Sequence, residues 1–330
     1  MKSPAAETIK TADKGTLDRK KIVDGLSRFA IPIALGVLIV IFSIMSSSFL
    51  TSRNIINIFR QVSIVGICAV GMTFVILTGG IDLSVGSVIG VAVVSASSLM
   101  VAGVHPVAAS IFALLIGVVL GVIIGFFINE VGVPPLITTL AFMTALRGVA
   151  YTTTKGLPVY GFPESFAFLG QGYIGGIPVP VIIMILVFIG GYILLNKTKF
   201  GRYVYGIGGN EEATRLSGIN VKLTKYKIYI LESFLASLAG IVLLSRVNSG
   251  QPKAGQGYEM DIITAVVLGG VSIAGGSGKI TGVITGVLLM GVLTNGMILI
   301  NVDEYSQWIV KGVVLLAAVS LDQMSHRTRD

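Results

Sequence analysis

Long apolar stretches alternate with short polar or glycine-rich segments along most of this chain. A run of about 17–25 apolar residues can cross a bilayer as a helix, and hydrocarbon favours helices because they pair their own backbone groups. Ten runs meet or approach this length: 29–49, 62–81, 86–104, 107–129, 136–153, 177–195, 228–245, 262–277, 280–300 and 305–321. The fifth, eighth and tenth are marginal, so the pattern predicts eight to ten spans, about ten in all.

The composition places these runs in one membrane domain. Of the 330 residues, 53% are apolar and only 12% are charged, about half the charged share of soluble proteins. We therefore predict an all-α polytopic membrane protein with glycine-broken helices. Its transmembrane domain covers 29–321, with a polar N-terminal tail at 1–28 and a C-terminal tail at 322–330.

The net charge of +8 changes the picture by setting an orientation. With ten spans, seven basic residues precede the first run, seven lie in 196–227, and Lys279, Arg327 and Arg329 fall on the same side. Five basic residues, Arg53, Arg60, Lys155, Arg246 and Lys253, fall on the other side. Cytoplasmic loops are enriched in Lys and Arg, so both tails and the segment 196–227 are predicted to be cytoplasmic.

A glycine-rich segment at the end of the second run is the strongest candidate for a solute path. Residues 79–87 (GGIDLSVGS) echo residues 269–277 (GGVSIAGGS), with four of nine positions identical, and such paired interruptions point to transport sites. A carboxylate such as Asp82 is costly in hydrocarbon, so Asp82 lines a water-filled cavity or caps a helix N-terminus at the membrane boundary. Chance similarity between glycine-rich segments is the alternative explanation of the echo. The candidate path residues are Thr78, Gly79, Gly80, Asp82, Ser84, Gly86, Thr138, Thr139, Arg147, Gly269, Gly270 and Asn295.

Other polar residues within the runs have structural readings. Lys311 is expected to extend its ammonium group to the nearer membrane surface. Glu232 is expected near the cytoplasmic end, where it reaches the surface or pairs with a basic loop residue. Gly117, Gly121 and Gly125 form a helix-packing face, within the subunit or across a dimer.

The segment 208–219 predicts a short cytoplasmic helix. Asn210 can cap it, acidic residues fill its first turn, and Gly218 can end it. A short exposed helix between spans suits docking to a partner, although a solvated connector has the same pattern. The candidate docking residues are Glu211, Glu212, Ala213, Thr214 and Gly218.

The sequence offers no catalytic or nucleotide site. The segment 275–282 (GGSGKITG) lacks both the first glycine and the Ser or Thr after lysine that a phosphate-binding loop requires. One cysteine, Cys68, and two histidines leave no plausible metal cluster. We therefore predict no enzyme activity, no metal and no cofactor bound to this chain.

Four motifs together resemble the permease subunits of ribose-type carbohydrate ABC importers, over about residues 50–322. They are GMTFVILTGGIDLSVGS from Gly71, NKTKFGRYVYGIGGNEEATRLSGINV from Asn196, SGQPKAGQGYEMDIITAVVLGG from Ser249 and SQWIVKG from Ser306. The resemblance implies a multi-pass protein of the bacterial inner membrane that works as a permease homodimer. It also implies a cytoplasmic ATPase subunit that binds the ATP, and an extracytoplasmic sugar-binding protein.

The resemblance also assigns roles to residues. Glu212 to Gly218 looks like the coupling motif that docks on the ATPase, although Leu231 stands where that motif has proline. The region of Gln251, Pro252, Tyr258 and Glu259 resembles the part expected near the binding protein. The implied function is import of a monosaccharide by alternating access, with ribose as the first candidate. Another sugar, a furanose signal, a nucleoside, a branched-chain amino acid, or an ion-coupled secondary transporter are the alternatives.

Overall fold

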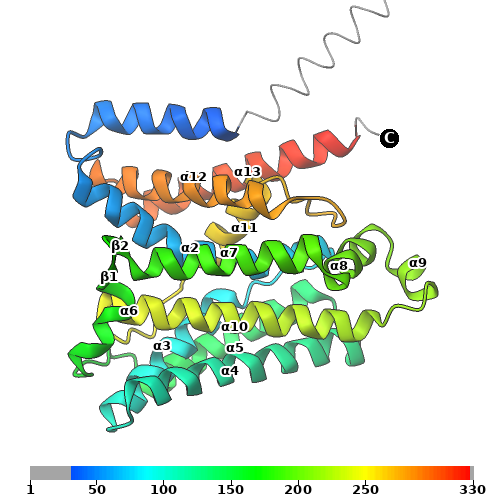
Figure 1. Ribbon diagram of the computed structural model, residues 1–330, viewed down its shortest axis with the longest axis horizontal. Helices are drawn as coiled ribbons and strands as arrows, with labels where there is room; N and C mark the ends of the chain where they lie inside the picture. Colours follow the sequence, from blue (N-terminus) through cyan, green and yellow to red (C-terminus); the bar gives the residue numbers. More distant parts are fainter. Residues whose placement is uncertain (1–30, 328–330) are drawn as a thin grey trace, which may run out of the picture.

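The computed structural model describes residues 31–327 as a bundle of helices that run roughly along one axis (Figure 1). The predicted tail at 1–28 lies outside the described residues. The helices are Ile31–Met45, α2 (Ser52–Leu77), α3 (Val85–Val101), α4 (Pro106–Phe126) with the π-helical turn η1 (Phe127–Val131), α5 (Pro135–Thr154), α6 (Phe168–Gln171), α7 (Val179–Lys197), α8 (Lys199–Gly209), α9 (Glu211–Leu216), α10 (Val221–Val247), α11 (Tyr258–Leu268), α12 (Ile280–Leu299) and α13 (Glu304–Arg327).

Each of the ten predicted runs contains a helix, which confirms the all-α class and the multi-pass architecture. Five helices, α2, α4 with η1, α7, α10 and α12, are long and apolar enough to cross a membrane. The eighth run is the exception. Its helix α11 has 11 residues, or about 16 Å at 1.5 Å per residue, about half of a 30 Å hydrocarbon core. The prediction of one span over 262–277 is therefore wrong, because Gly269 and Gly270 end the helix early.

Helices α2 and α10 form the centre of the bundle, with 83% and 78% of the residues in an 18-residue apolar stretch of each helix buried. Helices α4 and α7 lie outside, with 39% and 33% buried, as expected for lipid-facing helices. The glycines of α4 explain how it approaches α10 so closely. A Cβ on Gly121 would lie 2.6 Å from the Cα of Ile230, and Cβ atoms on Gly117 and Gly125 would also meet α10. The predicted glycine face therefore packs within the subunit.

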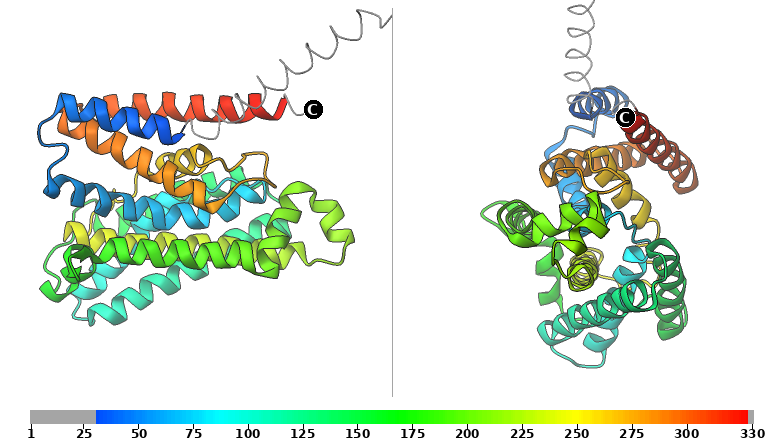
Figure 2. Two further views of the ribbon diagram at one scale, coloured as in Figure 1. Left: turned by 45° about the horizontal axis from the view of Figure 1, so that its top comes forward. Right: turned by 90° about the vertical axis from the view of Figure 1, so that its right-hand side faces the viewer.

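The two ends of the bundle differ (Figures 1 and 2). At one end, the connection after α5 carries the short helices η2 (Glu164–Ala167) and α6 and a hairpin of β1 (Tyr173–Ile174) and β2 (Ile177–Pro178), paired antiparallel. A single bridge between Val159 and Gly250 joins this connection to the loop that follows α10. At the other end, α8 and α9 project beyond the long helices. We call these the hairpin end and the α9 end.

Candidate functional site

The backbone between α2 and α3 is unwound over 78–84, as the glycines predicted. Gly79 takes a φ of +75°, a conformation that glycine adopts without strain. Asp82 is 1% exposed, and its Oδ1 accepts hydrogen bonds from the backbone N–H and the hydroxyl of Ser84 at 2.7 and 2.6 Å. Its Oδ2 has no hydrogen-bond partner within 31–327. Asp82 thus orders the turn into α3 and keeps one free carboxylate oxygen.

Helix α5 closes over this unwound segment. The hydroxyl of Thr139 donates to the carbonyl of Ile81 at 3.1 Å, and the hydroxyl of Ser87 donates to the carbonyl of Met143 at 2.7 Å. Thr138 is also buried but donates to Val133, near its own helix start. Of the two predicted threonines, Thr139 alone contacts the broken segment through a side-chain hydrogen bond.

The two echoing segments meet at the α9 end, together with the end of α8. The N–H of Gly276 donates to the carbonyl of Leu77 at 2.9 Å. A Cβ on Gly275 would lie 2.9 Å from the nitrogen of Gly79, and one on Gly208 would overlap the carbonyl of Leu77. We call this three-way backbone contact, made by residues 77–80, 208–209 and 275–276, the glycine junction. Three segments far apart in sequence touch here because none carries a side chain at the contact.

Helix α9 is joined to the glycine junction by a single residue, Asn210. The Asn210 side chain caps α9 by accepting from the N–H of Ala213 at 2.8 Å, as predicted. Glu211 pairs with Lys225 of α10 at 2.7 Å and Glu212 with Arg215 at 2.7 Å. Thr214 is buried and faces Gly206 of α8. Gly218 follows the helix with a φ of +82°.

The outward side of α9 is available to a partner. The side chains of Glu212 and Arg215 are 63% and 66% exposed, and Leu216 at the helix end is 77% exposed. The hydrogen bond with Glu212 raises the pKa of the Arg215 guanidinium. A solvated helix that carries an exposed leucine beside an ion pair has the character of a docking element.

Toward the hairpin end, Arg147 joins α5 to the loop between α10 and α11. Its guanidinium donates to the carbonyls of Pro252 and Ala254 at 3.1 and 2.8 Å. Gly86 of α3 approaches the same loop, since a Cβ there would overlap Glu259 and the carbonyl of Gly255. The structure thus brings predicted path residues and predicted binding-protein residues together. Pro252 is buried and Gln251, Tyr258 and Glu259 are half-buried.

Two expectations for intramembrane charges are wrong. Lys311 does not extend to a membrane surface, because its Nζ pairs with Oδ2 of Asp261 at 2.7 Å, with side chains 15% and 9% exposed. Glu232 does not reach the surface or a basic loop residue. It is fully buried between α10 and Gly71 of α2, and neither carboxylate oxygen has a hydrogen-bond partner among the described residues.

Asn295 belongs to a buried amide pair that the sequence did not reveal. The amides of Asn54 and Asn295 donate to each other at 2.9 and 3.0 Å, and Asn54 also donates to the carbonyl of Phe49 at 2.9 Å. This pair ties α12 to the start of α2. Across the described part of the chain, no group of three or more Asp, Glu, His or Cys side chains is placed to hold a metal ion.

Comparisons with known proteins agree on one family. The profile described as "Branched-chain amino acid transport system / permease component" matches residues 54–319. The ribose import permease protein of Bacillus subtilis (strain 168) is 47% identical over 318 residues, which cover 96% of this chain and 99% of that protein. The corresponding Escherichia coli (strain K12) protein is 48% identical over 88% of this chain and 92% of its own length.

A relative with another cargo name is more distant. The L-arabinose transport system permease protein of Escherichia coli (strain K12) is 39% identical over 92% of both chains. No solved structure gives a significant match to this chain.

Proposed function

Because this chain belongs to the branched-chain amino acid transport system / permease component family, within its ribose-type carbohydrate branch, we propose that it is the membrane-spanning subunit of an ATP-driven monosaccharide importer whose cargo is ribose. The observation that carries this proposal is 47% identity over 99% of the length of a protein named as a ribose import permease. The lower identity to the arabinose protein, 39%, favours ribose. The chain is accordingly a multi-pass protein of the inner membrane and a permease subunit.

ATP hydrolysis by a separate ATPase subunit on the cytoplasmic face drives import. The sequence lacks a phosphate-binding loop, so this chain does not supply that site itself. The excess of basic residues around 196–227 supports a cytoplasmic α9 end and cytoplasmic termini. The exposed face of α9, with Glu212 and Leu216, is then the docking element, and Glu211, Ala213, Thr214 and Gly218 hold its shape.

Movement of α9 has a short route to both broken helices. Helix α8 leads directly into α9, and Gly208 at its end touches the end of α2 and the α11–α12 loop. A displacement of α9 by the ATPase therefore shifts the backbone on both sides of the solute path, without bending a long helix. Alternating access follows, with sugar delivered at the hairpin end by a binding protein and released at the α9 end. Two copies of this chain form the permease.

The test is reconstitution of the chain in liposomes with the ATPase and the binding protein that co-purify with it. The expected result is ATP-dependent ribose uptake that stops when either partner is omitted, with slower uptake of arabinose and xylose. Uptake by the purified chain alone, driven by an ion gradient, would refute the proposal in favour of a secondary transporter. Cross-linking of two permease copies in the same liposomes tests the homodimer.

A further inference from the structure

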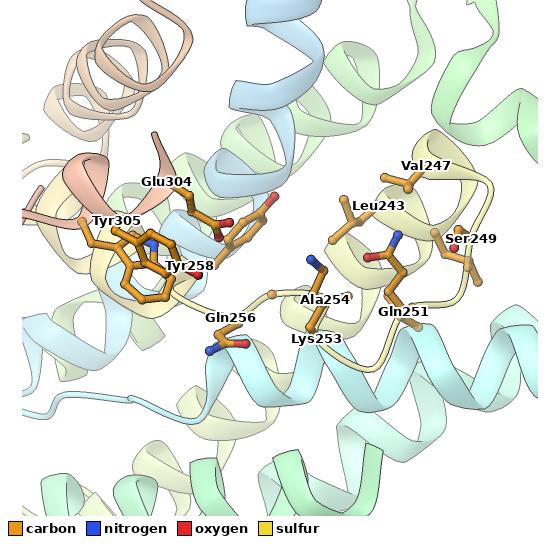
Figure 3. Close-up of a pocket in the computed structure, with 14 residues that line it drawn as sticks. Leu243, Val247, Ser249, Gln251, Lys253, Ala254, Gln256, Tyr258, Glu304 and Tyr305 are labelled. Atoms are coloured by element: carbon orange, nitrogen blue, oxygen red, sulfur yellow. The ribbon is translucent and has the colours of Figure 1, made fainter. Parts of the chain in front are cut away.

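A cavity lined by both polar and apolar side chains opens at the hairpin end, away from the glycine junction. A part of about 270 Å³ lies between the end of α10, the loop 248–257 and the start of α13 (Figure 3). A part of about 640 Å³ adjoins it between α11 and α13. Gln256, Tyr258, Glu304 and Trp308 line both parts, so the two lie against each other. The larger part falls in the range of roughly 300–1,000 Å³ that is usual for small-molecule sites.

The ion pair of Asp261 and Lys311 lies in the wall of the larger part. Burying two charges in a membrane protein is costly, and this pair leaves hydrogen-bonding capacity unused. Oδ1 of Asp261 is buried with no partner among residues 31–327. An ammonium group has three donors, and the one side-chain hydrogen bond seen for Lys311 goes to Asp261. The Lys311 ammonium group, whose side chain is 15% exposed, therefore keeps donors that a ligand in the cavity can use.

One face of α13 supplies the rest of the wall. Glu304, Trp308, Lys311 and Leu315 follow each other at helical spacing and all line the larger part. The Trp308 ring is held edge-to-face against Tyr305, with centroids 5.7 Å apart and planes at 85°. Gln307 lies beside it in the same wall. The start of the helix is fixed by Ser306, whose hydroxyl and N–H donate to Asp303 and lower its pKa.

This set of groups fits a neutral polyhydroxy ligand better than a charged one. An aromatic ring offers a face for the C–H side of a sugar ring, and planar carboxylate and amide groups can bond two adjacent hydroxyls. An anion would face Glu304, Glu259 and Asp261 against the single cation Lys311 in this wall.

We propose that this cavity is the sugar-binding site of the permease on its delivery side, with Trp308 stacking on the ring of the monosaccharide, Lys311 and Gln307 hydrogen-bonding its hydroxyls, and Asp261 holding the Lys311 ammonium group in place. The proposal rests on the function proposed above, because a monosaccharide cargo is what the site is built to receive. It places substrate contacts on α13, whereas the sequence pointed to the segment around Asp82.

Protection of introduced cysteines by ribose tests the site directly. The native Cys68 is buried, so labelling by a small water-soluble thiol reagent reports an introduced cysteine. Gln307→Cys is placed in the cavity wall, and Leu157→Cys, 68% exposed on the hairpin-end connection, is the control. In the full complex with ATPase and binding protein, ribose is expected to slow labelling of Gln307→Cys at least fivefold and to leave Leu157→Cys unchanged. Sucrose serves as the osmotic control.

Equal labelling of Gln307→Cys with and without ribose, while the wild-type complex imports ribose under the same conditions, would overturn the site and leave the importer intact. A wild-type complex that imports no ribose would instead overturn the proposed function.

Exchanging the two charges of the Asp261–Lys311 pair gives a second test of the site. Asp261→Lys combined with Lys311→Asp keeps the ion pair, so a purely structural pair predicts normal uptake. The proposed site predicts a normal amount of protein in the membrane with ribose uptake lowered at least tenfold.

Discussion

Replacing Gly208 by alanine is expected to separate α9 from the unwound segments that meet at the glycine junction. Gly208 ends α8 two residues before the cap of α9, and a Cβ there would overlap the carbonyl oxygen of Leu77 and lie 3.0 Å from the Cα of Gly276. Both neighbours are backbone atoms, which a rotamer change cannot move. The three segments of the glycine junction must therefore part.

The size of the effect follows from these contacts. Inserting a methyl group into a packed site costs about 1–3 kcal/mol, and losing the hydrogen bond from Gly276 to Leu77 adds about 1 kcal/mol. Alanine returns at most about 1 kcal/mol through its better helix propensity. The net loss at the junction is about 1–3 kcal/mol. This is enough to change the population ratio of the junction with its three segments in contact to the junction with them apart by roughly one to two orders of magnitude.

Gly209 provides a matched control in the next position. A Cβ there would meet nothing within 4 Å, so Gly209→Ala changes the same helix end but adds a methyl group that points away from the other two segments of the junction. The assays are thermal denaturation of the purified permease and ribose-stimulated ATP hydrolysis by the complex in liposomes. Gly208→Ala is expected to lower the midpoint by several degrees and to reduce stimulation at least fivefold, and Gly209→Ala to change neither. Equal behaviour of the two variants would refute the role of the junction.

Three further predictions concern other contacts. Glu212→Lys should lower ribose-stimulated ATP hydrolysis and leave membrane insertion intact, since it breaks only a solvent-exposed pair with Arg215, and such pairs contribute little to stability; unchanged hydrolysis would count against docking by α9. Asn54→Ala should lower the thermal midpoint by leaving the buried amide of Asn295 unpaired, at a cost of about 1–3 kcal/mol, and a fully additive Asn54→Leu, Asn295→Leu double variant would argue against the pair. Gly121→Ala should cost about 1–3 kcal/mol in the same denaturation assay, because α4 would be pushed from α10, whereas Gly148→Ala on α5, with open space around it, should be neutral.

The sequence predicted those features of the fold that depend on local pattern. Apolar run length located every long helix, and the cap at Asn210 located α9, because both signals lie within a few residues of the structure they predict. The eighth run shows the limit of this reasoning. Its apolar length over 262–277 is close to a span, but two adjacent glycines end α11 at Leu268, and apolar length alone does not reveal a break. The prediction of a site around Asp82 remains untested.

Local sequence patterns did not predict the contacts between residues that are far apart in the chain. Asn54 and Asn295 lie 241 positions apart, and Asp261 and Lys311 lie 50 apart on different helices. Asn295 and Lys311 each read as an isolated polar group in an apolar run, and their partners Asn54 and Asp261 lie outside the predicted runs, which led to the wrong placement of Lys311. An uncompensated charge in a membrane needs a partner or a wet cavity. A lysine two turns inside a helix end therefore called for a search among the acidic residues of other helices.

The short helix α11 connects the cavity between α11 and α13 to the loop that forms part of the glycine junction. Its first turn carries Tyr258 and Asp261 in the cavity wall, and its other end runs into the loop whose Gly275 and Gly276 touch the glycine junction. A helix of 11 residues is stiff over about 16 Å, so a shift of that loop moves the acidic end of the cavity relative to Lys311 on α13. A full-length span would place these two ends on opposite membrane surfaces. Because the helix is half as long, a displacement at the α9 end can change the position of Asp261 and with it the proposed sugar contact at Lys311.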